Sequence, residues 1–341
     1  MIRRWIIRFP ASLLGMIGIL LAVATPASAD APGPTDYESR VVSISPTTDV
    51  ISVAFIGGDS FIELVVEEGH EVLVLGYNGE PYLRFDPDGT VWENTASPTR
   101  YLNEDRFAAV EIPAAADADA EPQWSAVGSA GRYAWHDHRT HWMNEARPPA
   151  ASPGDQILEA VVPLVIDGQD VDIAVASYWL PAPGAWSTTL VFGTALVALV
   201  GVFVARGVWR WGIAAGVGVG ALGLGLVAYQ SVPAETGPPR SLWLLPLIAL
   251  IALAAAAASR ARSTVGAALV RAALVFLAGS ELLFWGLSRR DAIRSAIIPS
   301  NAPELLDRLG IAVAAAVGLG VAVVSLIDLF AIGRPQPSPD S

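Results

Sequence analysis

Three of the four histidines in this chain fall within six residues of one another. They belong to the segment Trp135-His136-Asp137-His138-Arg139-Thr140-His141-Trp142-Met143. If the backbone before the turn is extended, His136 and His138 project from the same face, because side chains alternate along a strand. A turn after His138 would then bring His141 or Met143 towards them. The spacing therefore predicts a cluster of imidazoles.

Such a cluster predicts a transition-metal site with Cu or Zn as the cofactor. Two or three imidazoles with a carboxylate such as Asp137 suit zinc or copper(II), and imidazoles with the Met143 thioether suit copper. Asp137 could instead orient an imidazole through its ring N–H. His70, in a run of glutamates, reads as a solvated turn residue, with a distant fourth ligand as the alternative.

The same segment also fits a structural or partner-binding network. Arg139 could stack on an indole, of Trp135 or Trp142, and pair with Asp137, with the histidines hydrogen-bonded at its margin. In that case the segment would be a scaffold, or would bind a membrane or envelope protein partner. A catalytic role for the segment is the third alternative.

The composition is that of a membrane protein with an acidic soluble part. The 341-residue chain is 53% hydrophobic and only 16% charged, whereas soluble domains carry about 25% charged residues. Residues 31–185 hold 25 acidic residues against 7 arginines. This argues against nucleic acid as a partner, because phosphate binding needs a basic face. With no cysteine in the chain, disulfides and thiolate metal ligands are excluded.

The N-terminus has the three parts of a secretory signal peptide. Arg3, Arg4 and Arg8 precede an apolar run, and Ala27-Ser28-Ala29 forms a small-residue cleavage site. We expect a signal peptide at 1–29, an extracytoplasmic domain at 30–183, a transmembrane domain at 184–332 and a cytoplasmic tail at 333–341. An uncleaved N-terminal anchor, the alternative, would export the same domain.

The exported domain is expected to be an all-β antiparallel sandwich. Turn pairs such as Asn78-Gly79 and Asp167-Gly168 can supply the positive φ of tight hairpins. They separate short runs that are alternating or rich in β-branched residues. The expected strands are Ile51–Ile56, Phe61–Val66, Val72–Leu75, Tyr82–Phe85, Phe107–Ile112, Ile157–Ile166 and Val171–Trp179.

Five apolar runs follow, each near the ~20 residues that cross a bilayer. They predict an α-helical transmembrane bundle of five helices in the plasma membrane, with the C-terminus in the cytoplasm. The runs are Ser187–Ala205, Trp211–Tyr229, Leu242–Ala258, Ala267–Leu287 and Leu309–Phe330. On the second run, Gly212, Gly216 and Gly220 have the four-residue spacing that permits close helix packing. We expect them to pack inside the bundle, with dimerisation as the alternative.

Glu281 is the acidic residue deepest in the expected bundle, in the fourth run. An acid at that depth is costly and is a functional candidate by default. We expect it to face the bundle and to pair with Ser280, Arg271 or an outer arginine; protonation or snorkelling is the alternative. A membrane-embedded transporter or enzyme that uses Glu281 is the third functional hypothesis. The chain has no nucleophile elbow, phosphate loop or dinucleotide fingerprint, so we favour a non-enzymatic protein.

Three stretches carry a resemblance to known proteins. These are Gly76–Phe85, Ser97–Asn103 and above all Trp135–Met143, where the chain resembles a family of uncharacterised actinobacterial membrane proteins. That resemblance implies a signal peptide, an exported β-rich domain and a C-terminal helical bundle. In layout alone, the chain is similar to periplasmic copper-resistance proteins of the cupredoxin-like type. It departs from them in lacking a histidine at the mature N-terminus and the cysteine of a blue-copper site.

Overall fold

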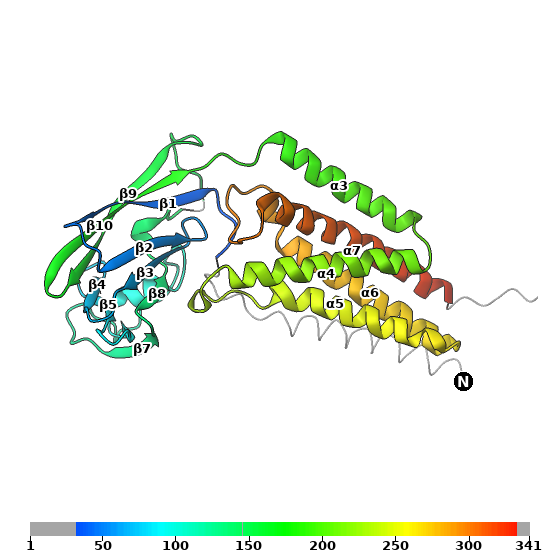
Figure 1. Cartoon of the computed structure of the whole chain (residues 1–341), viewed down its shortest axis with the longest axis horizontal. Coiled ribbons are helices and arrows are strands. Elements are labelled where there is room, and N and C mark those ends of the chain that lie inside the picture. The colour runs from blue at the N-terminus through cyan, green and yellow to red at the C-terminus, as the bar shows by residue number, and fades with distance from the viewer. Residues whose placement is uncertain (1–31, 145, 333–341) are drawn as a thin grey trace, which may run out of the picture.

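The protein has a β domain followed by five long helices (Figure 1). The computed structural model describes residues 32–144 and 146–332. The signal peptide expected at 1–29 and the tail expected at 333–341 lie outside the described residues. Between them, the β domain ends with a strand at Trp179, and the first long helix begins at Ala185.

The β domain is built from two antiparallel sheets, in agreement with the sequence prediction. One sheet has seven strands in the order β1-β10-β9-β4-β5-β6-β7, and the other has three in the order β2-β3-β8. The strands are β1 (Tyr37–Ser45), β2 (Ile51–Ile56), β3 (Phe61–Val66), β4 (Val72–Leu75), β5 (Pro81–Phe85), β6 (Val91–Asn94), β7 (Trp124–Gly128), β8 (Arg132–Trp135), β9 (Gln156–Ile166) and β10 (Gln169–Trp179).

Alternation along the strands places the core between the two sheets. Ile62 and Leu64 of β3 are fully buried, as are Val72 and Val74 of β4 in the other sheet. These residues belong to one apolar cluster that spans both sheets. The hairpin between β9 and β10 turns at Asp167-Gly168, where both residues have positive φ (49° and 83°), as an Asp-Gly hairpin requires.

One predicted strand is wrong. Phe107–Ile112 lies in irregular backbone after the short helix α2 (Pro98–Leu102). Ala108 has a left-handed φ of 56°, and Phe107 and Ile112 are each 39% exposed. The apolar residues of this run do not alternate between a core and solvent, so nothing holds the run in a sheet. Strands β1, β6, β7 and β8 were not among the predicted strands.

Five helices within the described residues are long and apolar enough to cross a membrane, as predicted. They are α3 (Ala185–Val204), α4 (Val208–Gln230), α5 (Ser241–Ala258), α6 (Val265–Ser288) and α7 (Glu304–Ile332). Helix α7 packs against α6, α3 and α4, and α5 packs between α4 and α6. α4, α5, α6 and α7 therefore form a ring, with α3 against the outside of α7.

The glycines that pack helices together are not the ones that the spacing indicated. No atom lies within 4 Å of a Cβ built at Gly212, Gly216 or Gly220, and all three are exposed, so the expectation that they pack inside the bundle is wrong. Tight contacts occur elsewhere, between α4 and α5 at Gly225 and between α6 and α7. There a Cβ on Gly279 would lie 2.6 Å from the backbone nitrogen of Ala322.

Alanine substitutions at these glycines should therefore have opposite effects. Gly279→Ala forces backbone apart at the contact of α6 and α7, and we expect it to destabilise the protein by about 1–3 kcal/mol. Gly216→Ala meets no neighbour and should be neutral or stabilise the helix by up to roughly 1 kcal/mol. Thermal unfolding of the two purified variants in detergent compares them, and equal midpoints would contradict this packing.

The β domain meets the bundle through the chain linker and through contacts with the loops between the helices. The chain enters α3 directly after the linker that follows β10. In addition, Thr35 and Ile297 exchange two backbone hydrogen bonds of 3.1 and 2.9 Å, and the Asp36 carboxylate accepts from the backbone N–H of Ala296 at 2.8 Å. The segment before β1 is thereby fixed to the loop between α6 and α7 (Figure 1).

Candidate metal centre

The clustered histidines lie where strand β8 ends and the chain turns back. Beyond Trp135 the backbone is still extended, with φ −138° and ψ 115° at Asp137. Side chains therefore continue to alternate, and His136 and His138 project to the side opposite Trp135 and Asp137. The sequence prediction for these two histidines assumed this geometry.

A capped turn then brings in the third histidine. The Asp137 side chain accepts a hydrogen bond from the backbone N–H of Arg139 at 3.0 Å and so caps the 3-10 helix η1 (His138–Thr140). The Thr140 hydroxyl donates to the Asp137 carbonyl at 2.8 Å and closes the same turn. The chain reverses over η1, and His141 returns beside His136.

The three imidazoles converge on one point. The ring of His136 lies 4.3 Å from that of His141 and 5.2 Å from that of His138, between centroids. One nitrogen from each ring can be chosen such that all three atoms lie within 4.8 Å of one another. Among the described residues, this is the one group of three or more potential ligands of this kind.

One nitrogen of each imidazole forms a hydrogen bond with a backbone carbonyl oxygen. His136 Nδ1 lies 2.7 Å from the carbonyl oxygen of Ser60, His138 Nε2 lies 2.9 Å from that of Asp105, and His141 Nδ1 lies 3.1 Å from that of Trp142. Because a carbonyl only accepts, each of these nitrogens must carry the proton. The other nitrogen of each ring is then a lone-pair donor.

Two of these lone-pair nitrogens are buried without a partner. Nε2 of His136 and Nε2 of His141 have no hydrogen-bond partner in the described part of the chain, and their residues are only 4% and 1% exposed. Buried polar atoms are normally satisfied, so two orphans in one cluster call for a physical explanation. A shared cation supplies one, since it would satisfy both atoms together.

The electrostatics of the cluster keep the rings neutral. Burial lowers the pKa of all three imidazoles, because the charged form loses its hydration. The pKa of His136 falls to about 4, and the adjacent His136 ring lowers the pKa of His141 further. Neutral imidazole is the form in which histidine binds a metal.

An ion pair joins the two loops that supply the Ser60 and Asp105 carbonyls. Ser60 follows Asp59, and Asp105 precedes Arg106. The Arg106 guanidinium forms an ion pair with the fully buried Asp59 carboxylate. The pair thus ties the loop that orients His136 to the loop that orients His138, and no sequence pattern indicated this role.

The other face of the segment forms the structural network that the sequence suggested, with one correction. Asp137 accepts from Arg139 Nη2 at 2.7 Å and from Trp135 Nε1 at 3.1 Å. The Arg139 guanidinium lies over the ring of Tyr77, 5.1 Å from its centroid, rather than over an indole. Burial alone would raise the pKa of the Asp137 carboxyl, but the Arg139 charge and these hydrogen bonds hold it below its ordinary value.

Two of the remaining candidates, Asp137 and His70, lie outside the cluster. Asp137 is not part of the ligand group, because its oxygens are turned to Arg139 and Trp135. Met143 is 37% exposed, and the Trp142 indole donates to the carbonyl of Ala146 at 2.8 Å. His70 is likewise outside the cluster and pairs with Asp167 at 2.6 Å in an exposed turn.

A cavity of about 420 Å³ adjoins the cluster on the side of the bundle. His136, Tyr37, Arg106 and Trp142 line it from the β domain, and Ser295 lines it from the loop before α7. The cluster is therefore close to the junction of the two domains.

Glu281 is buried in α6 and is 2% exposed. The pairing that the sequence suggested is not found: Ser280 donates to the carbonyl of Phe276, and Arg271 donates to that of Ser259. No described group donates to Glu281 Oε2. The residue faces the interior, as expected, but without the expected partner.

Comparisons with protein-family models, with curated proteins and with solved structures find no match to this chain. The fold and the site define a multi-helix membrane protein whose β domain carries a histidine cluster compatible with metal binding.

Proposed function

We propose that this protein binds one transition-metal ion, Zn²⁺ or Cu²⁺, through His136, His138 and His141 in an extracytoplasmic domain. The observation that carries the proposal is the pair of orphaned Nε2 atoms on His136 and His141, buried inside a group of three converging imidazoles. Each ring is also oriented by a carbonyl that fixes its proton on the far nitrogen. Metal-binding histidines typically have this arrangement.

A purely structural cluster does not account for these atoms. Neutral histidine has one donor and one acceptor nitrogen, and here every donor is already used on a carbonyl. The acceptor nitrogens of His136 and His141 then have no hydrogen-bond partner among the described residues. The hydrogen bonds that join Trp135, Asp137 and Arg139 are formed on the opposite face and use no imidazole nitrogen.

The donor set favours a borderline ion. Three nitrogens around a tetrahedral zinc ion lie about 2.0–2.1 Å from it and hence about 3.4 Å apart. One nitrogen from each ring lies within 4.8 Å of the others, so metal binding requires these atoms to come closer by roughly 1.4 Å at most. Three imidazoles also suit copper(II), whereas Mg²⁺ and Ca²⁺ prefer oxygen ligands. An exogenous water or anion would complete the coordination.

We place the site on the outer side of the plasma membrane, with the end of α7 in the cytoplasm. The signal-peptide pattern of residues 1–29 supports export, and five apolar helices put the two ends of the bundle on opposite sides. We also propose that the chain belongs to the actinobacterial family that it resembles. A role in copper handling and a protein partner in the envelope are further parts of this proposal. Lipid surrounds the helices.

Metal analysis of the purified full-length protein tests the proposal. We expect about one Zn or Cu per chain after loading and dialysis, and none in the double variant His136→Ala with His141→Ala. The matched control is His70→Ala, which removes the one histidine outside the cluster and should keep the metal.

Wild-type protein that holds no metal would contradict the proposal and leave the segment as a scaffold. Equal loss of metal in His70→Ala would also contradict it, because the binding would then not depend on the cluster.

A further inference from the structure

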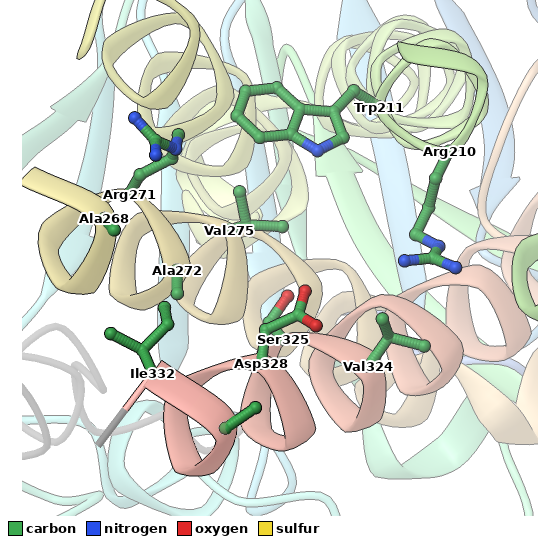
Figure 2. A pocket seen from close by; sticks show the side chains of 11 residues that line it. Arg210, Trp211, Ala268, Arg271, Ala272, Val275, Val324, Ser325, Asp328 and Ile332 are labelled. Atoms are coloured by element: carbon green, nitrogen blue, oxygen red, sulfur yellow. The ribbon is translucent and has the colours of Figure 1, made fainter. Parts of the chain in front are cut away.

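A second cavity lies in the helical bundle (Figure 2). The helix ends that line it are those far from the β domain (Figure 1). Its volume is about 440 Å³. It is bounded by the beginning of α4, the first half of α6 and the end of α7. It is independent of the histidine cluster, and neither the histidines nor Glu281 line it.

Two arginines line this cavity, and their hydrogen-bond partners are uncharged. Arg210 of α4 donates to the carbonyls of Val202 and Ala205 at 3.0 and 2.7 Å, and Arg271 of α6 donates to the carbonyl of Ser259 at 3.2 Å. These partners are neutral and fix the guanidinium groups in place. Within residues 32–144 and 146–332, neither arginine has an ion pair with a carboxylate.

An aspartate shares the cavity but does not pair with the arginines. Figure 2 shows Asp328 of α7 in the space between Arg210 and Arg271. The charged side chains of the lining therefore sum to +1. A singly charged anion matches this lining, whereas a phosphate monoester or a pyrophosphate would carry excess negative charge against Asp328.

The walls become apolar further into the bundle. Val275 lies one helical turn beyond Arg271 on α6, and Ala272 beside it is buried. Near the open end, the Trp211 indole lines the cavity and carries the Arg260 guanidinium 4.0 Å above its ring. Tryptophan and arginine together are typical of the depth at which lipid headgroups lie.

We propose that this cavity binds a phosphodiester, with its single negative charge between Arg210 and Arg271. Arginine suits this group because its planar guanidinium donates to two phosphate oxygens at once. The diester can come from a phospholipid headgroup, whose acyl chain would lie along Val275 and Ala272, or from a soluble glycerophosphodiester. Both sources present the same anion to the arginines.

Native mass spectrometry of the full-length protein in detergent tests this proposal. The two probes are dioleoyl phosphatidylglycerol and soluble glycerophosphoglycerol, each titrated separately. We expect the double variant Arg210→Gln with Arg271→Gln to bind the probe at least about tenfold more weakly, since each arginine near a membrane surface contributes about a fivefold change in affinity. Binding of the lipid alone assigns the source as the membrane, and binding of both probes assigns recognition to the phosphodiester itself.

The matched control is Arg206→Gln with Arg262→Gln. These two exposed arginines lie at the same end of the bundle but outside the cavity, so their loss should change the affinity less than twofold. Because Arg210 and Arg271 also hold helix ends, Ala268→Trp provides a second variant that fills the cavity and leaves both arginines in place. Wild-type affinity in Ala268→Trp, or equal losses in the two arginine pairs, would overturn the proposal.

Discussion

Loading with Zn²⁺ or Cu²⁺ should raise the thermal midpoint of the wild-type protein and leave that of His141→Leu unchanged. A ligand at 1,000 times its Kd stabilises the folded state by about 4.1 kcal/mol. For a domain of this size, such a change corresponds to roughly 10 °C. His141→Leu lacks one of the three converging nitrogens, so metal should not stabilise it.

Without metal, His141→Leu should be about as stable as the wild-type protein. In metal-free wild type, the buried Nε2 of His141 has no partner among the described residues, and such an atom destabilises the fold by roughly 1–3 kcal/mol. His141→Leu removes that atom together with one hydrogen bond to the Trp142 carbonyl. We therefore expect the metal-free variant to lie within about 1 kcal/mol of metal-free wild type.

Calorimetry of wild type, His141→Leu and His70→Ala, each with and without metal, gives the comparison. His70→Ala should gain as much from the metal as wild type, because His70 pairs with Asp167 in an exposed turn. If metal does not shift the wild-type midpoint, the cluster is structural. A large loss of stability in metal-free His141→Leu would point to the same conclusion.

Arg139→Ala should be among the most destabilising single substitutions in the β domain. The Asp137 carboxylate is fully buried, and Arg139 neutralises it through two side-chain hydrogen bonds of 2.9 and 2.7 Å. Removing one partner of a buried ion pair leaves an uncompensated charge, at a cost of about 3–5 kcal/mol. The contact of the guanidinium with the Tyr77 ring is lost as well.

The chain contains a close control for this substitution. Arg40 also pairs with an acid two residues earlier, Glu38, and also lies over a tyrosine ring, that of Tyr178 at 4.9 Å. Its side chain is 56% exposed, whereas that of Arg139 is 16% exposed. Exposed pairs contribute about 0–1 kcal/mol, so Arg40→Ala should be mild. Equal losses in the two variants would show that burial of Asp137 does not set the effect.

Local geometry explains which parts of the site could be predicted from the sequence. His136, His138 and His141 are related by strand alternation and one turn, both of which depend only on neighbouring residues. The Ser60 and Asp105 carbonyls lie 76 and 33 positions from the rings that they orient. Contacts of that range depend on the tertiary fold, so no spacing rule reveals them.

The aromatic partner of Arg139 also depends on the tertiary fold and not on neighbouring residues. An indole next to Arg139 in the chain was the natural expectation, but Trp135 donates to Asp137 instead. Tyr77, from the loop between β4 and β5, takes the position over the guanidinium. Helix positions were easier to predict, because a run of about 20 apolar residues has few alternatives to a membrane span.

The predictions for the α4 glycines and for a strand at Phe107–Ile112 were wrong. A four-residue glycine spacing on α4 marks one face of the helix but does not say whether another helix covers it, and the structure leaves that face exposed. In Phe107–Ile112 the apolar residues lie in a loop with a left-handed Ala108. Both errors concern which surface is covered, and that depends on elements distant in the sequence.

The most direct test of the metal site is X-ray absorption spectroscopy of the full-length protein loaded with one equivalent of Zn²⁺ or Cu²⁺. We predict three imidazole nitrogens about 2.0–2.1 Å from the ion and no sulfur near 2.3 Å, because the proposed ligands are three imidazoles and the Met143 side chain is 37% exposed. A spectrum with fewer than two imidazoles, or with a sulfur ligand, would contradict binding by His136, His138 and His141.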